Sequence, residues 1–223
     1  IDNAAGVASA EEAARLFRPR LGSFAVLGGH DYATVNPIRA YTSLLTRDQH
    51  ELYGAKNPAQ ELTRRLEGRG VRVLHDQHVR LKALNDQGLA VVGLRDAFVF
   101  ESDFDAAWGG LDRQMPVVVI AHSPDVVHEV CRRRANLAFF GHTHGGQVRL
   151  PLVGAIVTRS CVPRRLASGT FSDGTTVFIV SNGLGTSPVV PYRFMCRPEV
   201  VIAELFRSPS PEDLTRVREA HLG

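Results

Sequence analysis

Three short hydrophobic runs along the chain each end in a loop that contains histidine. The runs are Phe24–Leu27, Val117–Ile120 and Leu137–Phe140. A run of four hydrophobic residues is too short for a helix and indicates a buried strand. In α/β sheets, functional groups gather beyond the carboxyl ends of the strands. We therefore predict that the histidines of the three loops share one site: His30, His122, His142 and His144.

The rest of the pattern predicts a single α/β domain over residues 1–223, without an internal repeat or a linker. Helical periodicity and capping residues predict helices at 9–17, 37–45, 58–68, 104–108 and 126–134, and a polar C-terminal helix at 209–221. Hydrophobic or alternating segments predict strands at 71–74, 79–84, 89–94, 177–180 and 200–205, with a turn at 85–88.

The histidine loops favour a metal site. Imidazole binds zinc, manganese and iron well, and His142 and His144 leave one loop that glycines flank. The alternative is that each histidine is an ordinary polar residue at the end of a strand. Because three loops repeat the same order of strand, small residue and histidine, the metal interpretation is favoured.

Five ordered motifs resemble the calcineurin-like metallophosphoesterases, in particular a bacterial phosphodiesterase branch that includes membrane-associated enzymes and a lipid A precursor pyrophosphatase. The motifs are GGHDY at 28–32, AHSPD at 121–125, GHTHGGQVRLP at 141–151, GLGTS at 183–187 and RFMCRPE at 193–199. The resemblance implies a sandwich of two mixed β-sheets flanked by helices.

The resemblance also implies hydrolysis of phosphodiester or pyrophosphate bonds with divalent metal ions, two in the complete family site, of manganese, zinc or iron. On this basis His122 and His142 would bind one ion and His144 the other. His30 would be the acid or phosphate-binding histidine, oriented by Asp31.

The chain departs from the family pattern in three places. The Asp-x-His strand end is absent, and the chain opens at Ile1-Asp2-Asn3, as if cut immediately after the bridging aspartate of the second motif. We therefore expect the domain to be N-terminally incomplete and to lack an N-terminal strand. Gly29 stands where the family has a ligand asparagine. Three histidines without a matched carboxylate are too few for a site of two ions, and they leave room for one ion or for none.

Three functions follow from these observations. The first is a metal-dependent phosphodiester or pyrophosphate hydrolase. The second is a catalytically impaired relative that binds a phosphorylated ligand or partner without turnover. The third is a basic membrane-surface or scaffold protein.

The charge and composition of the chain limit which binding partners are expected. The 223 residues carry a net charge of +3, and arginine supplies nearly all of the positive charge. The clusters at 132–134 and 164–165 face either phosphates or anionic lipid, or plain solvent, and plain solvent is favoured because no aromatic pattern accompanies them; nucleic-acid binding is not predicted. We expect a phosphate-ester substrate, lipid- or cell-wall-linked in the branch, and leave the oligomeric state and membrane-surface association open.

No signal or membrane-spanning segment is evident in the sequence, whereas the resemblance implies a membrane-associated or periplasmic location. The three cysteines, Cys131, Cys161 and Cys196, are expected to be buried thiols. Asp125 either supports the site or caps a helix, and Asp96 either supports the site or ends a strand. The second role is favoured for each. Arg149 and Arg193 either bind a substrate phosphate or pair with Glu199 or a carbonyl.

Overall fold

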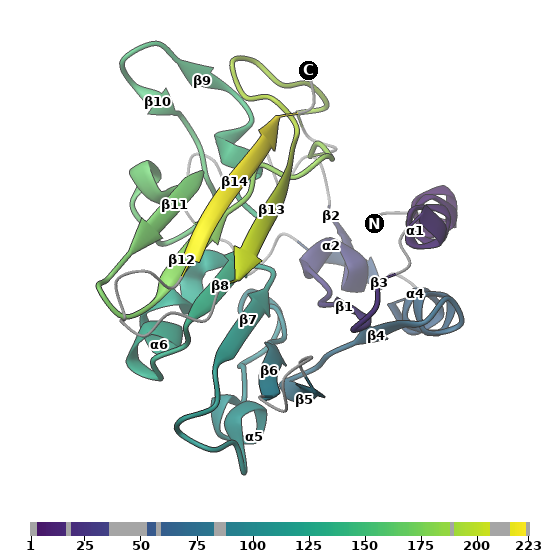
Figure 1. Ribbon diagram of the computed structural model, residues 1–223. Coiled ribbons are helices and arrows are strands. Elements are labelled where there is room, and N and C mark those ends of the chain that lie inside the picture. Colours follow the sequence, from purple (N-terminus) through teal and green to yellow (C-terminus); the bar gives the residue numbers. More distant parts are fainter. Residues whose placement is uncertain are drawn as a thin grey trace. The chain divides into compact units, whose positions relative to one another are not determined.

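The computed structural model describes residues 4–16, 19–35, 53–56, 59–82, 88–187, 190–205 and 215–221. The chain forms two compact units, Ile1–Pro116 and Val117–Gly223 (Figure 1). That the two constitute a single domain stays a prediction. In the described part no helix combines the length and the hydrophobicity needed to span a bilayer.

The first unit is built from short strands and helices. Its helices are α1 (Ala4–Leu16), α2 (Gly29–Tyr32), α4 (Ala59–Glu67) and α5 (Phe104–Trp108). Its strands are β1 (Ser23–Ala25), β2 (Ala33–Val35), β3 (Tyr53–Lys56), β4 (Val71–Val73), β5 (Gln77–Lys82) and β6 (Gly88–Gly93). β1 pairs in parallel with β4, whereas β2 with β3 and β5 with β6 form antiparallel pairs. The core of the unit gathers Val7, Leu27, Leu62, Leu66, Val71 and Val73, so α1 and α4 pack on the β1–β4 pair.

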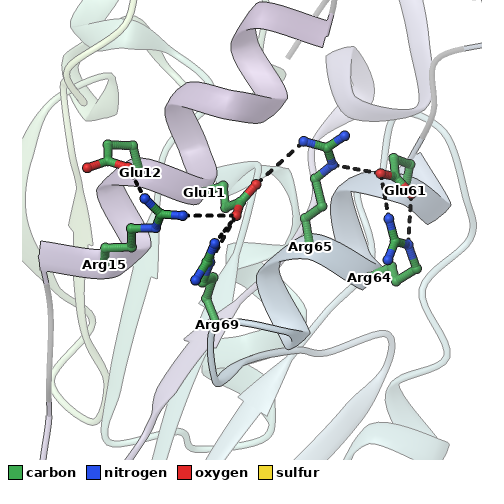
Figure 2. Close-up of polar contacts among 7 residues, drawn as sticks. All are labelled: Glu11, Glu12, Arg15, Glu61, Arg64, Arg65 and Arg69. Atoms are coloured by element: carbon green, nitrogen blue, oxygen red, sulfur yellow. Dashed lines mark hydrogen bonds and ion pairs between the residues drawn. The ribbon is translucent and has the colours of Figure 1, made fainter.

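A network of arginines and glutamates ties α1 to α4 (Figure 2). Glu11 of α1 accepts a hydrogen bond from Arg69 Nε at 2.9 Å and lies 3.5 Å from Arg65 and 3.7 Å from Arg15. Arg65 also binds Glu61 at 2.6 Å. The hydrogen bond from Arg69 is the main reason why the pKa of Glu11 is held below its ordinary value. The Glu11 carboxylate therefore joins three arginines from two separate chain segments.

We predict that Glu11→Gln lowers the melting temperature at pH 7. A carboxylate whose pKa is lowered by folding contributes stability above its unfolded pKa of about 4.3, and this contribution is lost as the pH falls through the folded value. The difference between the variant and the wild type should therefore shrink below about pH 4. Glu12→Gln is the matched control, because exposed Glu12 binds Arg15 alone among the ion pairs of this network. Equal losses in the two variants would contradict the role of Glu11.

The second unit is a mixed sheet with a hairpin and several short turns. Its strands are β7 (Val117–Ala121), β8 (Leu137–Phe140), β9 (Arg149–Leu150), β10 (Gly154–Ala155), β11 (Gly169–Ser172), β12 (Val177–Val180), β13 (Glu199–Leu205) and β14 (Thr215–His221). Its helical segments are η1 (Pro124–Val126), α6 (Val127–Arg132), η2 (His144–Gly146) and η3 (Arg164–Leu166). β7, β8 and β12 are parallel, and β11 adds antiparallel to β12. Val119, Leu137 and Ile179, one on each of the parallel strands, are fully buried.

The α/β class predicted from the sequence is confirmed. The helix at 104–108 and the strand at 177–180 have the predicted bounds. The first helix begins earlier than predicted, at Ala4, and the segment predicted as one helix at 126–134 divides into η1 and α6. The predicted helix at 37–45 and most of the turn at 85–88 lie outside the described residues.

The predicted C-terminal helix at 209–221 is wrong over its described part. Residues Thr215–His221 form β14, which pairs antiparallel with β13 from Glu199↔His221 to Leu205↔Thr215. The hairpin is seen in Figure 1 as two long antiparallel arrows. A polar segment with few hydrophobic residues gains little from helix packing, whereas the open edge of β13 offers it a full set of backbone partners.

Candidate active site

The parallel pairing of β7 with β8 brings two of the predicted histidines together. His122 follows β7 and His142 follows β8 after one glycine, and the Gly141 N–H donates to the His122 carbonyl at 2.9 Å. His142 Nδ1 lies 3.2 Å from His122 Nε2, and the rings meet edge to face with centroids 5.1 Å apart. The carboxyl edge of this sheet therefore carries a pair of imidazoles whose nitrogens converge.

A backbone carbonyl sets the orientation of His142. His142 Nε2 lies 2.7 Å from the Arg159 carbonyl, which can only accept, so this nitrogen carries the proton. In the neutral ring Nδ1 then has a free lone pair, directed at His122. In a metal-binding histidine, one ring nitrogen binds the metal and the N–H of the other nitrogen usually donates to a carbonyl, a carboxylate or water.

The pair fits two positions of a metal site. Two ligands at ~2.0–2.1 Å from a tetrahedral ion lie ~3.3 Å apart, close to the spacing of His122 Nε2 and His142 Nδ1. The same contact serves as an N–H···N hydrogen bond when His122 keeps its proton on Nε2. Across the described residues, no group of three or more His, Cys, Asp or Glu is arranged to hold an ion. The histidine pair is therefore a partial site, and the predicted set of three ligands stays a prediction.

His144 is held by a different loop. Its Nδ1 lies 3.2 Å from the Gly185 carbonyl, in the GLGTS segment, so Nδ1 donates and Nε2 is the acceptor nitrogen of the neutral ring. Both His142 and His144 adopt left-handed backbone conformations, with φ of 66° and 50°. Such conformations are costly for residues other than glycine and cluster in functional loops.

His30 and Asp31 lie in the first unit, on the single turn α2. The Asp31 carboxylate accepts a hydrogen bond at 2.8 Å from the N–H of Gly28, the residue before the helix. Gly29 is buried beside it. Asp31 thus caps the turn that presents His30, and the catalytic roles of the two residues stay predictions.

Asp125 fixes the loop that orients His142. Its Oδ1 accepts from Ser160 Oγ and from the Cys161 N–H, each at 2.6 Å, and its Oδ2 accepts from Ser123 Oγ at 2.8 Å. These bonds hold the residues next to Arg159, whose carbonyl binds His142. The helix-capping role favoured from the sequence belongs instead to Ser123, which accepts from the Asp125 N–H. Asp96, by contrast, ends local structure as favoured, since it accepts from the Phe98 N–H at 3.1 Å.

Arg193 binds carbonyls, which is one of the alternatives left open by the sequence. Its guanidinium donates to the carbonyls of His144 at 3.1 Å, Asn182 at 2.8 Å and Gly185 at 2.5 Å. Arg193 therefore joins the His144 loop to the GLGTS loop that holds the His144 ring. Arg149 likewise donates to the Gly145 carbonyl at 3.1 Å.

The cysteines divide into three environments. Cys196 is buried, and its thiol donates to the His144 carbonyl at 3.2 Å. Cys131 is half-buried, and this burial is the main cause that raises its thiol pKa to about 11. Cys161 is exposed, so the prediction that all three are buried thiols is wrong for this residue. It is exposed because its role in the loop is played by its backbone N–H, which binds Asp125.

We predict that Asp125→Ala loosens the loop at 159–161 and releases the His142 ring. Nitrogen-15 spectra of the imidazoles should show loss of the single Nε2–H tautomer of His142, because the Arg159 carbonyl is no longer held in place. The control is Asp173→Ala, which removes a carboxylate from a turn of the same unit, where it accepts from the Thr175 and Thr176 amides. Unchanged His142 signals in Asp125→Ala would refute this positioning role.

Gly145 is required by the packing beneath the histidine loop. Its φ is 65°, and a Cβ there would meet Asn182 Oδ1 at 2.0 Å and Cys196 Sγ at 2.7 Å. Gly183 has nearly the same φ, 66°, but a Cβ there has open space within 4 Å. Substitution of Gly183 by alanine therefore measures the cost of backbone strain alone, whereas substitution of Gly145 adds the cost of a steric clash.

We predict that Gly183→Ala costs about 1 kcal/mol of unfolding free energy, from backbone strain alone. Gly145→Ala should cost at least about 2 kcal/mol more, because the Asn182 and Cys196 side chains have to move. Urea unfolding of the two variants measures both values. Equal costs would show that the packing around Gly145 yields freely.

Comparison with known proteins gives several curated relatives. The UDP-2,3-diacylglucosamine pyrophosphatase LpxG of Chlamydia trachomatis is 28% identical over 221 aligned positions, covering 85% of this chain and 65% of the relative. The phosphodiesterase YaeI of Escherichia coli is 31% identical over 63% of this chain and 49% of its own. The metallophosphoesterase YkuE of Bacillus subtilis is 27% identical over 61% and 47%.

The chain thus spans about half to two thirds of the length of these relatives. No family model matches the chain. No solved structure matches it either.

Proposed function

We propose that the chain is a calcineurin-like metallophosphoesterase, a metal-dependent hydrolase of phosphodiester or pyrophosphate bonds, because it is 27–31% identical to a metallophosphoesterase, a phosphodiesterase and a pyrophosphatase. The names of two relatives, a phosphodiesterase and a sugar-nucleotide pyrophosphatase, suggest this class of substrate. The observation that carries the proposal is the approach of His122 Nε2 to His142 Nδ1 at the ends of two parallel strands.

In this proposal His122 and His142 hold one divalent ion, and His144 binds a second. The ions would supply Lewis-acid activation of water and stabilisation of the charge that develops on the phosphate. The carbonyls of Arg159 and Gly185 accept from one nitrogen of His142 and one of His144, which orients the two rings and makes the other nitrogen of each neutral ring the basic one, as a metal ligand requires. His30, presented by the turn that Asp31 caps, gives a proton to the leaving oxygen.

The second candidate is a relative that binds a phosphorylated ligand without turnover. Two observations favour it. Gly29 has no side chain to donate where the family motif has asparagine, and the described residues hold no complete group of three ligands. A metal bound by two histidines alone would be held weakly.

We predict that purified protein takes up manganese or zinc and hydrolyses an activated phosphodiester. His142→Ala should lose both metal and activity, because it removes one of the two converging nitrogens. His30→Ala should keep the metal and lose roughly 10²-fold in rate, the usual cost of removing a general acid. His128→Ala, an exposed residue of α6 outside the motifs, is the control for both measurements.

Metal content by elemental analysis and the rate of phosphodiester cleavage decide among the outcomes. Metal uptake that depends on His142 but yields no turnover would select the second candidate. Metal uptake that survives in His142→Ala would overturn the assignment of the site itself.

A further inference from the structure

The second unit exposes an unusual concentration of large hydrophobic side chains. Fourteen such side chains are exposed in the described part of the chain, and nine of them fall within residues 150–195. Six of the nine lie on two adjoining segments, and we name them the tip surface: Leu150, Leu152, Val153, Tyr192, Phe194 and Met195. Such a concentration marks an interaction site more often than ordinary surface.

The two segments of the tip surface are joined by backbone hydrogen bonds. The first is the β9–β10 hairpin, and the second is the loop at 190–196. Phe194 N–H donates to the Gln147 carbonyl at 2.9 Å, and Arg149 N–H donates to the Phe194 carbonyl at 3.0 Å. Val148 and Phe194 form a parallel bridge. The hydrophobic residues of the hairpin and the loop therefore belong to one continuous region.

The shape of this region is a projection. Residues 151–153 form the turn of the hairpin, and Leu152 at its centre has a φ of 64° and is fully exposed. Tyr192, Phe194 and Met195 are each between 51% and 61% exposed. A protruding turn with aromatic and aliphatic side chains suits insertion into a soft interface, because it needs no matching groove.

The charges around the tip surface are of one sign. Arg149 lies in the hairpin itself, and exposed Arg164 and Arg165 belong to η3, which contacts β10. Residues 141–172 contain no aspartate or glutamate. The hairpin and the neighbouring η3 thus combine exposed hydrophobic side chains with arginines in a stretch of sequence without acidic residues, and these two features draw a surface to anionic lipid.

We propose that the tip surface docks the protein on an anionic lipid bilayer, with the hairpin turn and the loop at 192–195 inserted at the headgroup level and the arginines bound to lipid phosphates. A protein partner would need acidic residues facing a convex hydrophobic projection, whereas an anionic bilayer offers negative charge and hydrophobic depth together. This inference does not depend on the proposed hydrolysis.

Sedimentation with lipid vesicles tests the proposal. The protein should bind vesicles of phosphatidylcholine with about 30% phosphatidylglycerol, and should bind pure phosphatidylcholine much less. Raising the salt from ~0.1 M to ~1 M shortens the screening length from ~10 Å to ~3 Å and should weaken the binding. The double variant Leu152→Ser/Val153→Ser should lower the vesicle partition coefficient roughly tenfold or more, because it removes the two most exposed side chains of the tip surface.

Leu16→Ser/Leu21→Ser is the matched control, since these two leucines are the exposed large hydrophobic residues described in the first unit. It should bind vesicles like the wild type, and melting curves confirm that both double variants stay folded. The proposal is overturned if the wild type ignores anionic vesicles or if both variants lose binding equally. It is also overturned if the wild type self-associates in sedimentation velocity, the tip variant does not, and neither binds lipid; the tip surface would then join copies of the chain.

Discussion

The candidate site depends on one structural constraint, the parallel pairing of β7 with β8. The register sets Ala121 opposite Phe140, so the next residues on the two strands, His122 and Gly141, leave the sheet at the same edge. One glycine later His142 turns back with a φ of 66°, and its ring meets that of His122. Val117, Val119 and Ala121 of β7 are buried and alternate with half-buried residues, so a slip by one residue would exchange the two faces; the sheet core thereby also fixes the histidine pair.

Two neighbouring loops orient the histidine rings of this unit through backbone carbonyl groups. The Arg159 carbonyl fixes the His142 ring and the Gly185 carbonyl fixes that of His144. Each of these loops is in turn held by a buried or half-buried polar side chain, Asp125 for one and Arg193 for the other. Carbonyls accept only, so they specify which nitrogen of each ring carries the proton and which is the basic one.

The difference between side chains at strand ends and backbone carbonyls in loops explains what could be predicted from the sequence. Short hydrophobic runs followed by histidine identify strand ends, and they correctly brought His122 and His142 together, because local pattern and sheet topology agree there. The partners of these rings are backbone atoms of Arg159 and Gly185, and a carbonyl has no sequence signature. Strand β14 was missed for a related reason: its pairing with β13 is a tertiary contact that overrides a weak helical pattern. The carbonyl contacts of Arg193 were only one of two alternatives, because a guanidinium offers the same donors to a phosphate and to a carbonyl.

One short segment connects the chemistry of the second unit with its surface. Along residues 192–196, Arg193 and Cys196 turn inward and bind the His144 carbonyl, while Tyr192, Phe194 and Met195 point to solvent. This short stretch of chain therefore supports the histidine loop on one side and carries exposed hydrophobic side chains on the other. Because the Phe194 backbone is bonded to Gln147 and Arg149, a force on the exposed side chains is transmitted to the segment that directly follows the histidine loop. Contact of the tip surface with a bilayer would therefore restrain the same loop that presents His144.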